Sequence, residues 1–185
     1  MKILLHACCA PCSIQCVEAL AEEQIKPDLF WYNPNIHPYT EYRSRLESLR
    51  VFAEDKTLPL IIDNEYGLRS FVKNATLIEQ NSAGESSGRC AFCYRLRLEK
   101  AAILAVEKAY DAFSTTLLIS TYQNHQLIRQ IGEELAGAYH IEFLYRDFRP
   151  RFRRGREQAR EAGYYMQKYC GCIYSEEERY LGKKT

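Results

Sequence analysis

The sequence predicts one α/β domain spanning residues 1–185, in which a mostly parallel sheet carries helices on both faces. Three observations support this fold class. Short apolar stretches alternate with longer amphipathic stretches, as expected when crossover helices join parallel strands. The length of 185 residues suits a single core. No internal repeat, low-complexity tract or linker divides the chain.

The predicted strands are short, apolar and bounded by turn residues. They cover residues 2–6, 28–32, 58–62, 113–119 and 141–145. The second strand is ended by the turn-forming sequence Asn33-Pro34-Asn35. Ligands of open α/β sheets bind at the carboxyl edge of the strands, so the loop after the first strand is well placed for chemistry.

The predicted helices have apolar residues at helical spacing between charged ones. They cover residues 13–23, 39–55, 65–74, 89–110, 123–136 and 151–162. Gly137 and Gly163 follow two of these helices as natural C-caps. Residues 81–88 are dense in Ser, Gly and Asn and are expected to form a mobile loop. The cysteine-bearing tail, about residues 164–185, is expected to pack near the functional site.

Charge and hydropathy limit the class of protein. The formal net charge of +1 argues against a uniformly basic coat for nucleic acid. The chain has no run of eighteen apolar residues and no basic, apolar leader. We therefore expect a soluble cytoplasmic protein with no membrane partner.

Arginines are concentrated in one short region. Seven lie within fifteen residues: Arg146, Arg149, Arg151, Arg153, Arg154, Arg156 and Arg160. This density is typical either of a phosphate-binding surface or of a solvated helix face, and the composition does not choose between them.

Eight cysteines in a chain without an export signal indicate metal binding or redox chemistry rather than disulfide stapling. Cys8 and Cys9 end the first strand, and Cys90 and Cys93 form a C-x-x-C at a predicted helix start, where the helix dipole favours thiolate. Together they supply the four thiolates that a [4Fe–4S] cluster requires. Structural zinc is the rival, but zinc ribbons normally use two C-x-x-C knuckles, so iron–sulfur is favoured.

The remaining cysteines are less clear. Cys12 is a spare ligand, a thiol beside the cluster or a core residue, whereas Cys16 is expected to be a small buried hydrophobe. Cys170 and Cys172 flank a glycine whose backbone freedom lets the two sulfurs approach each other or share a metal. A C-x-C disulfide closes a small strained ring, which is typical of a redox-active pair.

Asp147 follows the predicted fifth strand, at the same edge as the cysteine loop. It is a candidate acid, base or oxygen ligand, with an ion pair to Arg146 or Arg149 as the alternative. His6, inside the first strand, is expected to be a satisfied core residue. Phosphate loops, dinucleotide fingerprints and a Ser-His-Asp arrangement are absent from the sequence, which disfavours kinases, ATPases, simple dehydrogenases and serine hydrolases.

Four sequence blocks, in this order, resemble a known family. They are LHACCAPCS (5–13), RCAFCYRLR (89–97), DFRP (147–150) and YCGC (169–172), with support from NPNI (33–36) and residues 39–43. Together they resemble the epoxyqueuosine reductase family QueH, the cobalamin-independent enzymes of the last step of queuosine formation. The resemblance covers nearly the whole chain.

The resemblance implies a Rossmann-like domain related to nucleotide hydrolases and a [4Fe–4S] cluster held by Cys8, Cys9, Cys90 and Cys93. It also implies a redox-active disulfide pair at Cys170 and Cys172 and an additional mononuclear iron beside the cluster. The candidate ligands of that iron are Cys170, Cys172 and Asp147, and Cys12 is an alternative ligand.

The implied reaction is a two-electron removal of the epoxide oxygen of epoxyqueuosine in a tRNA anticodon loop, with Asp147 or a tyrosine supplying a proton. The implied partners are that tRNA and an external electron donor of ferredoxin or flavodoxin type. The predicted RNA contacts are Arg149, Arg151, Arg153 and Arg154. An iron–sulfur tRNA-thiolation enzyme and a zinc-stabilised RNA-binding module are the alternatives.

Overall fold

The computed structural model describes residues 1–81 and 86–182 and contains a five-stranded sheet in which every pairing is parallel. The strands are β1 (Ile3–His6), β2 (Asp28–Trp31), β3 (Leu60–Ile62), β4 (Ala112–Thr115) and β5 (Glu142–Phe143). Their order is β3-β2-β1-β4-β5, with Leu5 in register with Leu29 on one side and Ser114 on the other. The predicted parallel α/β class is confirmed.

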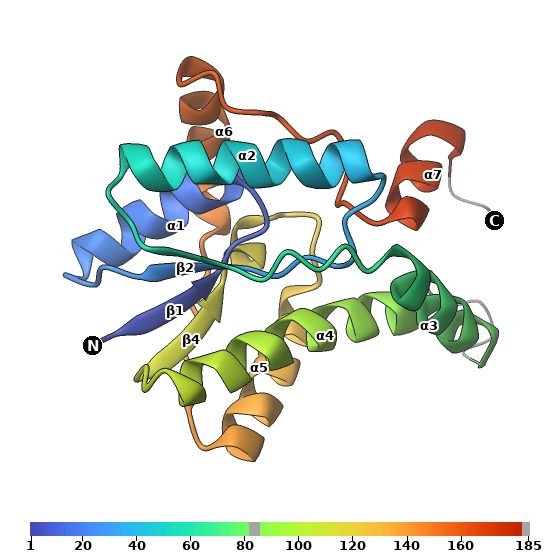
Figure 1. Ribbon diagram of the computed structural model, residues 1–185, viewed down its shortest axis with the longest axis horizontal. Coiled ribbons are helices and arrows are strands. Elements are labelled where there is room, and N and C mark those ends of the chain that lie inside the picture. The colour runs from blue at the N-terminus through green and yellow to red at the C-terminus, as the bar shows by residue number, and fades with distance from the viewer. Residues whose placement is uncertain (82–85, 183–185) are drawn as a thin grey trace.

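Helices cover both faces of the sheet. They are α1 (Ala10–Glu22), α2 (Tyr39–Asp55), α3 (Leu68–Asn81), α4 (Ser86–Glu107), α5 (His125–Tyr139), α6 (Phe152–Glu161) and α7 (Ile173–Leu181), with the 3-10 turns η1 (Thr116–Ile119) and η2 (Arg149–Arg151). Figure 1 shows α1, α2 and α6 on one side of the strands and α4 and α5 on the other. Within the described residues, no helix has the length and apolar character needed to cross a membrane.

The two central strands form the middle of the core. Every residue of β1 and β4 is buried, which accounts for their continuous rather than alternating character. The chain passes from β1 to β2 and β3 on one side, then returns to β4 and β5 on the other. The carboxyl ends of β1 and β4 therefore form the switch point of the sheet, where open α/β folds bind their ligands.

Most element bounds differ from the prediction, and three of the differences have a local reason. The strand expected over 113–119 stops at Thr115, because the Thr115 side chain accepts a hydrogen bond from the Leu117 N–H and starts η1. Helix α5 passes Gly137 and ends at Tyr139, where the next residue, His140, adopts the left-handed conformation with φ of 54°. Helix α7, which the sequence did not predict, begins where the Cys172 side chain accepts a hydrogen bond from the Ser175 N–H.

The loop expected over 81–88 is only partly within the described chain. Residues 82–85 lie outside it, while residues 86–88 already belong to α4. Helix α4 therefore starts three residues earlier than predicted, which moves the C-x-x-C away from the first turn.

Two glycines of the same helix should respond in opposite ways to alanine. A Cβ at Gly132 would clash with the Phe143 ring, whereas a Cβ at Gly137 would meet nothing within 4 Å. Gly132→Ala should lower the free energy of unfolding by about 1–3 kcal/mol through overpacking. Gly137→Ala should raise it by roughly 0.5–1 kcal/mol, because alanine favours the helix. Urea denaturation measures both, and a stabilised Gly132→Ala would contradict the α5–β5 packing.

Candidate functional site

Three buried thiols gather at the carboxyl end of β1. The Sγ atoms of Cys8, Cys9 and Cys12 all lie within 4.8 Å of one another, and those of Cys8 and Cys9 are 3.7 Å apart. Cys9 is the residue before α1, so Cys12 returns to the same side one helical turn later. We call these three residues the thiol trio. The structure thus places Cys12 with the site and not in a separate part of the core.

The three thiols of the trio differ in the direction in which their pKa is shifted. Hydrogen bonds from the Cys12 and Cys9 thiols hold the pKa of Cys8 well below its usual range. Burial raises the pKa of Cys9, and the hydrogen bond to Cys8 raises that of Cys12. Thr116, the first residue of η1, also donates to Cys8 Sγ at 3.6 Å and lowers its pKa. Of the three thiols, Cys8 is therefore the one whose pKa is lowered.

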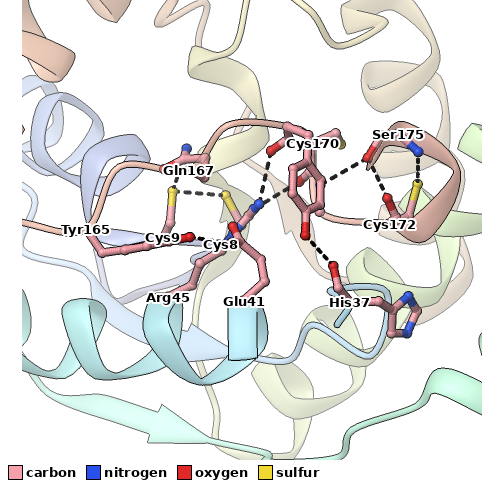
Figure 2. Close-up of polar contacts among 12 residues, drawn as sticks. Cys8, Cys9, His37, Glu41, Arg45, Tyr165, Gln167, Cys170, Cys172 and Ser175 are labelled. Carbon is pink, nitrogen blue, oxygen red and sulfur yellow. Dashed lines mark hydrogen bonds and ion pairs between the residues drawn. The ribbon is translucent and has the colours of Figure 1, made fainter. Parts of the chain in front are cut away.

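Arg45 connects the thiol trio to the segment between α6 and α7 (residues 162–172), which we call the C-terminal segment. Its guanidinium is 1% exposed and bonds Glu41 on the same helix at 2.7 Å. Its two terminal nitrogens donate to the carbonyl oxygens of Tyr169 and Cys170, each at 3.0 Å. Figure 2 shows this side chain between the two neighbouring cysteines and the Cys170 backbone.

The C-terminal segment covers the thiol trio directly. The Gln167 amide nitrogen donates to Cys9 Sγ at 3.1 Å and to Cys12 Sγ at 3.3 Å. Gly171 has φ of +135°, and a Cβ there would lie 3.2 Å from the Arg45 Nη1 atom. Only glycine combines this backbone conformation with so close an approach to the guanidinium.

Cys90 and Cys93 form a second group on α4. The thiol trio does not include them, and Cys93 packs in a small cluster with Phe71, Ala75 and Cys172. Because α4 begins at Ser86, both cysteines lie beyond its first turn. Burial raises the pKa of Cys93 although Arg97 opposes it, so the expected thiolate at a helix start is not found.

Arg97 lies between the two groups of cysteines. Its side chain is 1% exposed, and its nitrogens donate to the Cys93 carbonyl at 3.0 Å and to Cys93 Sγ at 3.1 Å. Burial lowers the pKa of Arg97, but the neighbouring sulfurs of Cys93, Cys170 and Cys8 together raise it. In residues 1–81 and 86–182, no carboxylate pairs with it. A buried cation needs a counter-charge, so its natural partners are the sulfurs.

Cys170 and Cys172 face different partners. Cys170 Sγ accepts a hydrogen bond from the Gln123 amide at 3.1 Å, and Cys172 Sγ accepts one from the Ser175 N–H at 3.4 Å. Both are free thiols, as are the other cysteines of the chain. The expected redox-active disulfide is therefore not supported, because one sulfur is turned to the β4–α5 connection and the other caps α7.

Asp147 makes the ion pair that was the alternative to a chemical role. Its carboxylate bonds the Arg149 guanidinium at 2.6 and 2.8 Å, and these bonds lower its pKa to about 2. Its role as acid or ligand stays a prediction.

His6 is fully buried and hydrogen-bonded to Thr115 at 2.9 Å and to Asn33 at 3.2 Å, which confirms it as a satisfied core residue.

The predicted RNA-contacting arginines lie on α6 and the turn before it. Each pairs with a carboxylate: Arg149 with Asp147, Arg151 with Glu22, Arg153 with Glu157 and Arg154 with Glu18. Exposed pairs of this kind contribute little to stability, so phosphates can replace the carboxylates.

Sequence reasoning missed the residues that bond the sulfurs or the backbone beside them. Arg97 had a usable signal, since it follows Cys93 by one helical turn. Arg45, Gln123 and Gln167 had none, because each reaches its partner across more than forty residues of sequence.

The donor set fits a metal that prefers sulfur. Cysteine thiolates are the ligands of iron–sulfur clusters and of structural zinc. Three close thiols supply most of such a centre, and Arg97 supplies positive charge that suits an anionic one.

Arg45 should be essential for holding the C-terminal segment over the thiol trio. Arg45→Met leaves the buried Glu41 carboxylate without its cationic partner, with only the Tyr165 hydroxyl still donating to it, so the free energy of unfolding should fall by about 3–5 kcal/mol. Amide hydrogen exchange over residues 165–175 should also become faster. Arg50→Met is the matched control on α2, because its pair with Glu47 is exposed and its loss should cost less than roughly 1 kcal/mol. Equal exchange in both variants would contradict the role of Arg45.

Comparison with known proteins identifies relatives along nearly the whole chain. The family model described as epoxyqueuosine reductase QueH matches residues 3–178. Proteins named epoxyqueuosine reductase QueH are similar to this chain in Dehalococcoides mccartyi (36% identical, covering 97% of this chain and 94% of that protein) and Acinetobacter baylyi (38%, 94% and 80%). The Thermotoga maritima protein of that name is 33% identical, covering 96% of this chain and 91% of its own.

A solved structure supports the fold alone. It is described as a predicted subunit of tRNA methyltransferase from Methanocaldococcus jannaschii, with a TM-score of 0.50 and 17% identity, covering 86% of this chain and 75% of that chain. The family match and the three sequence relatives carry the assignment. This chain belongs to the epoxyqueuosine reductase QueH family.

Proposed function

We propose that this chain reduces epoxyqueuosine to queuosine in tRNA. The epoxide oxygen leaves as water, an alkene remains, and the reaction consumes two electrons and two protons. The observation that carries the proposal is a buried thiol trio at the switch point of the sheet, in a chain that belongs to this family. Family membership does not favour the thiolation enzyme or the zinc-stabilised module.

For the cofactor we propose a [4Fe–4S] cluster held by Cys8, Cys9, Cys90 and Cys93. The closeness of Cys12 to Cys8 and Cys9 supports it as a further ligand or as a ligand of an additional mononuclear iron. Cys170, Cys172 and Asp147 are the other proposed ligands of that iron. When bound, such a cluster supplies electrons singly.

The chain's own residues prepare this centre. Arg45 and Gln167 hold the C-terminal segment over the thiols and keep water from them. Arg97 offsets negative charge on the sulfurs from within the core. Both arginines are buried, so their charges act with little screening by solvent.

A tyrosine is the better of the two proposed proton donors. The Tyr94 hydroxyl donates to the Gln123 side chain at 2.6 Å, and Gln123 in turn bonds Cys170. A tyrosine hydroxyl carries its proton at neutral pH, and burial raises the pKa of Tyr94 further. Asp147, with a pKa of about 2, has no proton to give there.

The proposed partners are tRNA carrying epoxyqueuosine and an external electron donor of ferredoxin or flavodoxin type. The contacts proposed for the tRNA phosphates are Arg149, Arg151, Arg153 and Arg154. Because its substrate is tRNA, we propose that the protein acts in the cytoplasm.

The direct test is product formation. Metal-loaded protein, purified without oxygen and supplied with a chemical reductant, should convert epoxyqueuosine in tRNA to queuosine, as measured by mass spectrometry of the digested nucleosides. Unchanged epoxyqueuosine, with protein that contains iron and sulfide in cluster amounts, would reject the function.

Cysteine variants should separate ligands from core residues. Cys8→Ser and Cys90→Ser should lose visible cluster absorbance and at least about 100-fold of turnover, because a cluster needs each thiolate. Cys16→Ser is the control, since Cys16 is buried on α1 but lies outside the thiol trio. Cys12→Ser distinguishes the two roles proposed for Cys12. Loss of the additional iron with the cluster intact supports Cys12 as a ligand of that iron, whereas loss of the cluster supports it as a further cluster ligand. Full iron content and full turnover in Cys8→Ser would contradict the proposed ligand set.

A further inference from the structure

Tyr122 projects from the connection between η1 and α5. Its side chain is 81% exposed, the highest value among the exposed large hydrophobic residues of the described chain. Its ring meets that of Phe152 edge-on, with the centroids 5.9 Å apart. Phe152 begins α6, so the two rings join the carboxyl edge of the sheet to the arginine-rich helix.

The next residue connects this surface to the candidate site. Gln123 donates to Cys170 Sγ at 3.1 Å and accepts a hydrogen bond from the Tyr94 hydroxyl. Consecutive residues of one connection thus hold an exposed aromatic ring and a contact to a site thiol.

The arginines of α6 continue the surface. Phe152, Arg156 and Arg160 are spaced by four residues and so lie along one side of the helix. The Arg156 guanidinium is 5.7 Å from the centroid of the Phe152 ring. We call Tyr122, Phe152, Arg156 and Arg160 the aromatic–arginine stripe.

These two arginines differ from the rest of the run. The other five each pair with a carboxylate. In the described part of the chain, neither Arg156 nor Arg160 forms an ion pair with a carboxylate. Their charges are available to an anionic partner without the loss of an existing pair.

We infer that the aromatic–arginine stripe binds single-stranded RNA next to the reacting nucleotide. Tyr122 stacks on an unpaired base, and Arg156 and Arg160 contact the backbone phosphates. An exposed ring beside unpaired guanidinium groups is the combination by which proteins bind unpaired nucleotides. The inference rests on the proposed function, since the RNA is its tRNA substrate, and it adds the aromatic rings of Tyr122 and Phe152 to an arginine run that the sequence already indicated.

Equilibrium binding of an anticodon stem-loop RNA tests the stacking contact. The protein is the metal-loaded full chain, and the RNA carries a fluorophore. Tyr122→Ala should weaken binding roughly tenfold, as loss of one stacked base does. Tyr122→Phe keeps the ring and should bind as the unaltered protein does. Tyr180→Ala, which removes another exposed tyrosine, is the matched control and should have no effect.

Salt dependence tests the arginines. The double variant Arg156→Gln and Arg160→Gln should reduce the slope of log Kd against log salt by roughly 0.7 for each lost phosphate contact. Arg129→Gln, an exposed arginine of α5 paired with Glu133, is the control and should leave the slope unchanged.

The outcomes separate this inference from the proposed function. If the unaltered protein forms queuosine while Tyr122→Ala binds the stem-loop normally, the inference fails and the proposed function stands. If the unaltered protein neither binds the RNA nor forms queuosine, both fail. If Tyr122→Ala binds RNA normally but loses turnover only with a protein electron donor, the stripe is the docking surface for that donor and the inference is overturned.

Discussion

The buried guanidinium of Arg45 is the interaction on which the rest of the site depends. It is fixed from one side by Glu41 and from the other by the carbonyls of Tyr169 and Cys170. A charge so deeply buried is stable only when every partner is in place. The C-terminal segment is therefore held in one position, and that position brings Gln167 over the thiol trio.

A second buried cation completes the electrostatics. Arg97 has the Cys93 sulfur as its side-chain neighbour, whereas Arg45 has a carboxylate. The two side chains belong to helices on opposite faces of the sheet, α4 and α2 (Figure 1). Negative charge on Cys8, the thiol whose pKa is lowered, is thus opposed by two fixed positive charges, in a place where solvent screens neither.

The fold was largely predictable because its signals are local. Alternating strands and helices, and the turn after β2, are carried by short stretches of sequence, and α2 was predicted to its end residues. The element ends that depend on one side chain, such as Thr115 at η1 and Cys172 at α7, were not predicted. The cysteine pairs were recognised by spacing, but the membership of Cys12 in the trio required the turn of α1 that begins at Ala10. Gln167 and Gln123 were beyond prediction, since polar residues in loops carry no periodic signal.

The distance along the chain between the parts of the site has a consequence for its biosynthesis. Cys8 leaves the ribosome before Gln167 and Cys170, which follow more than 150 residues later. The thiol trio therefore stays without this cover while those residues are being translated. The cover can form only after the last part of the site has been made.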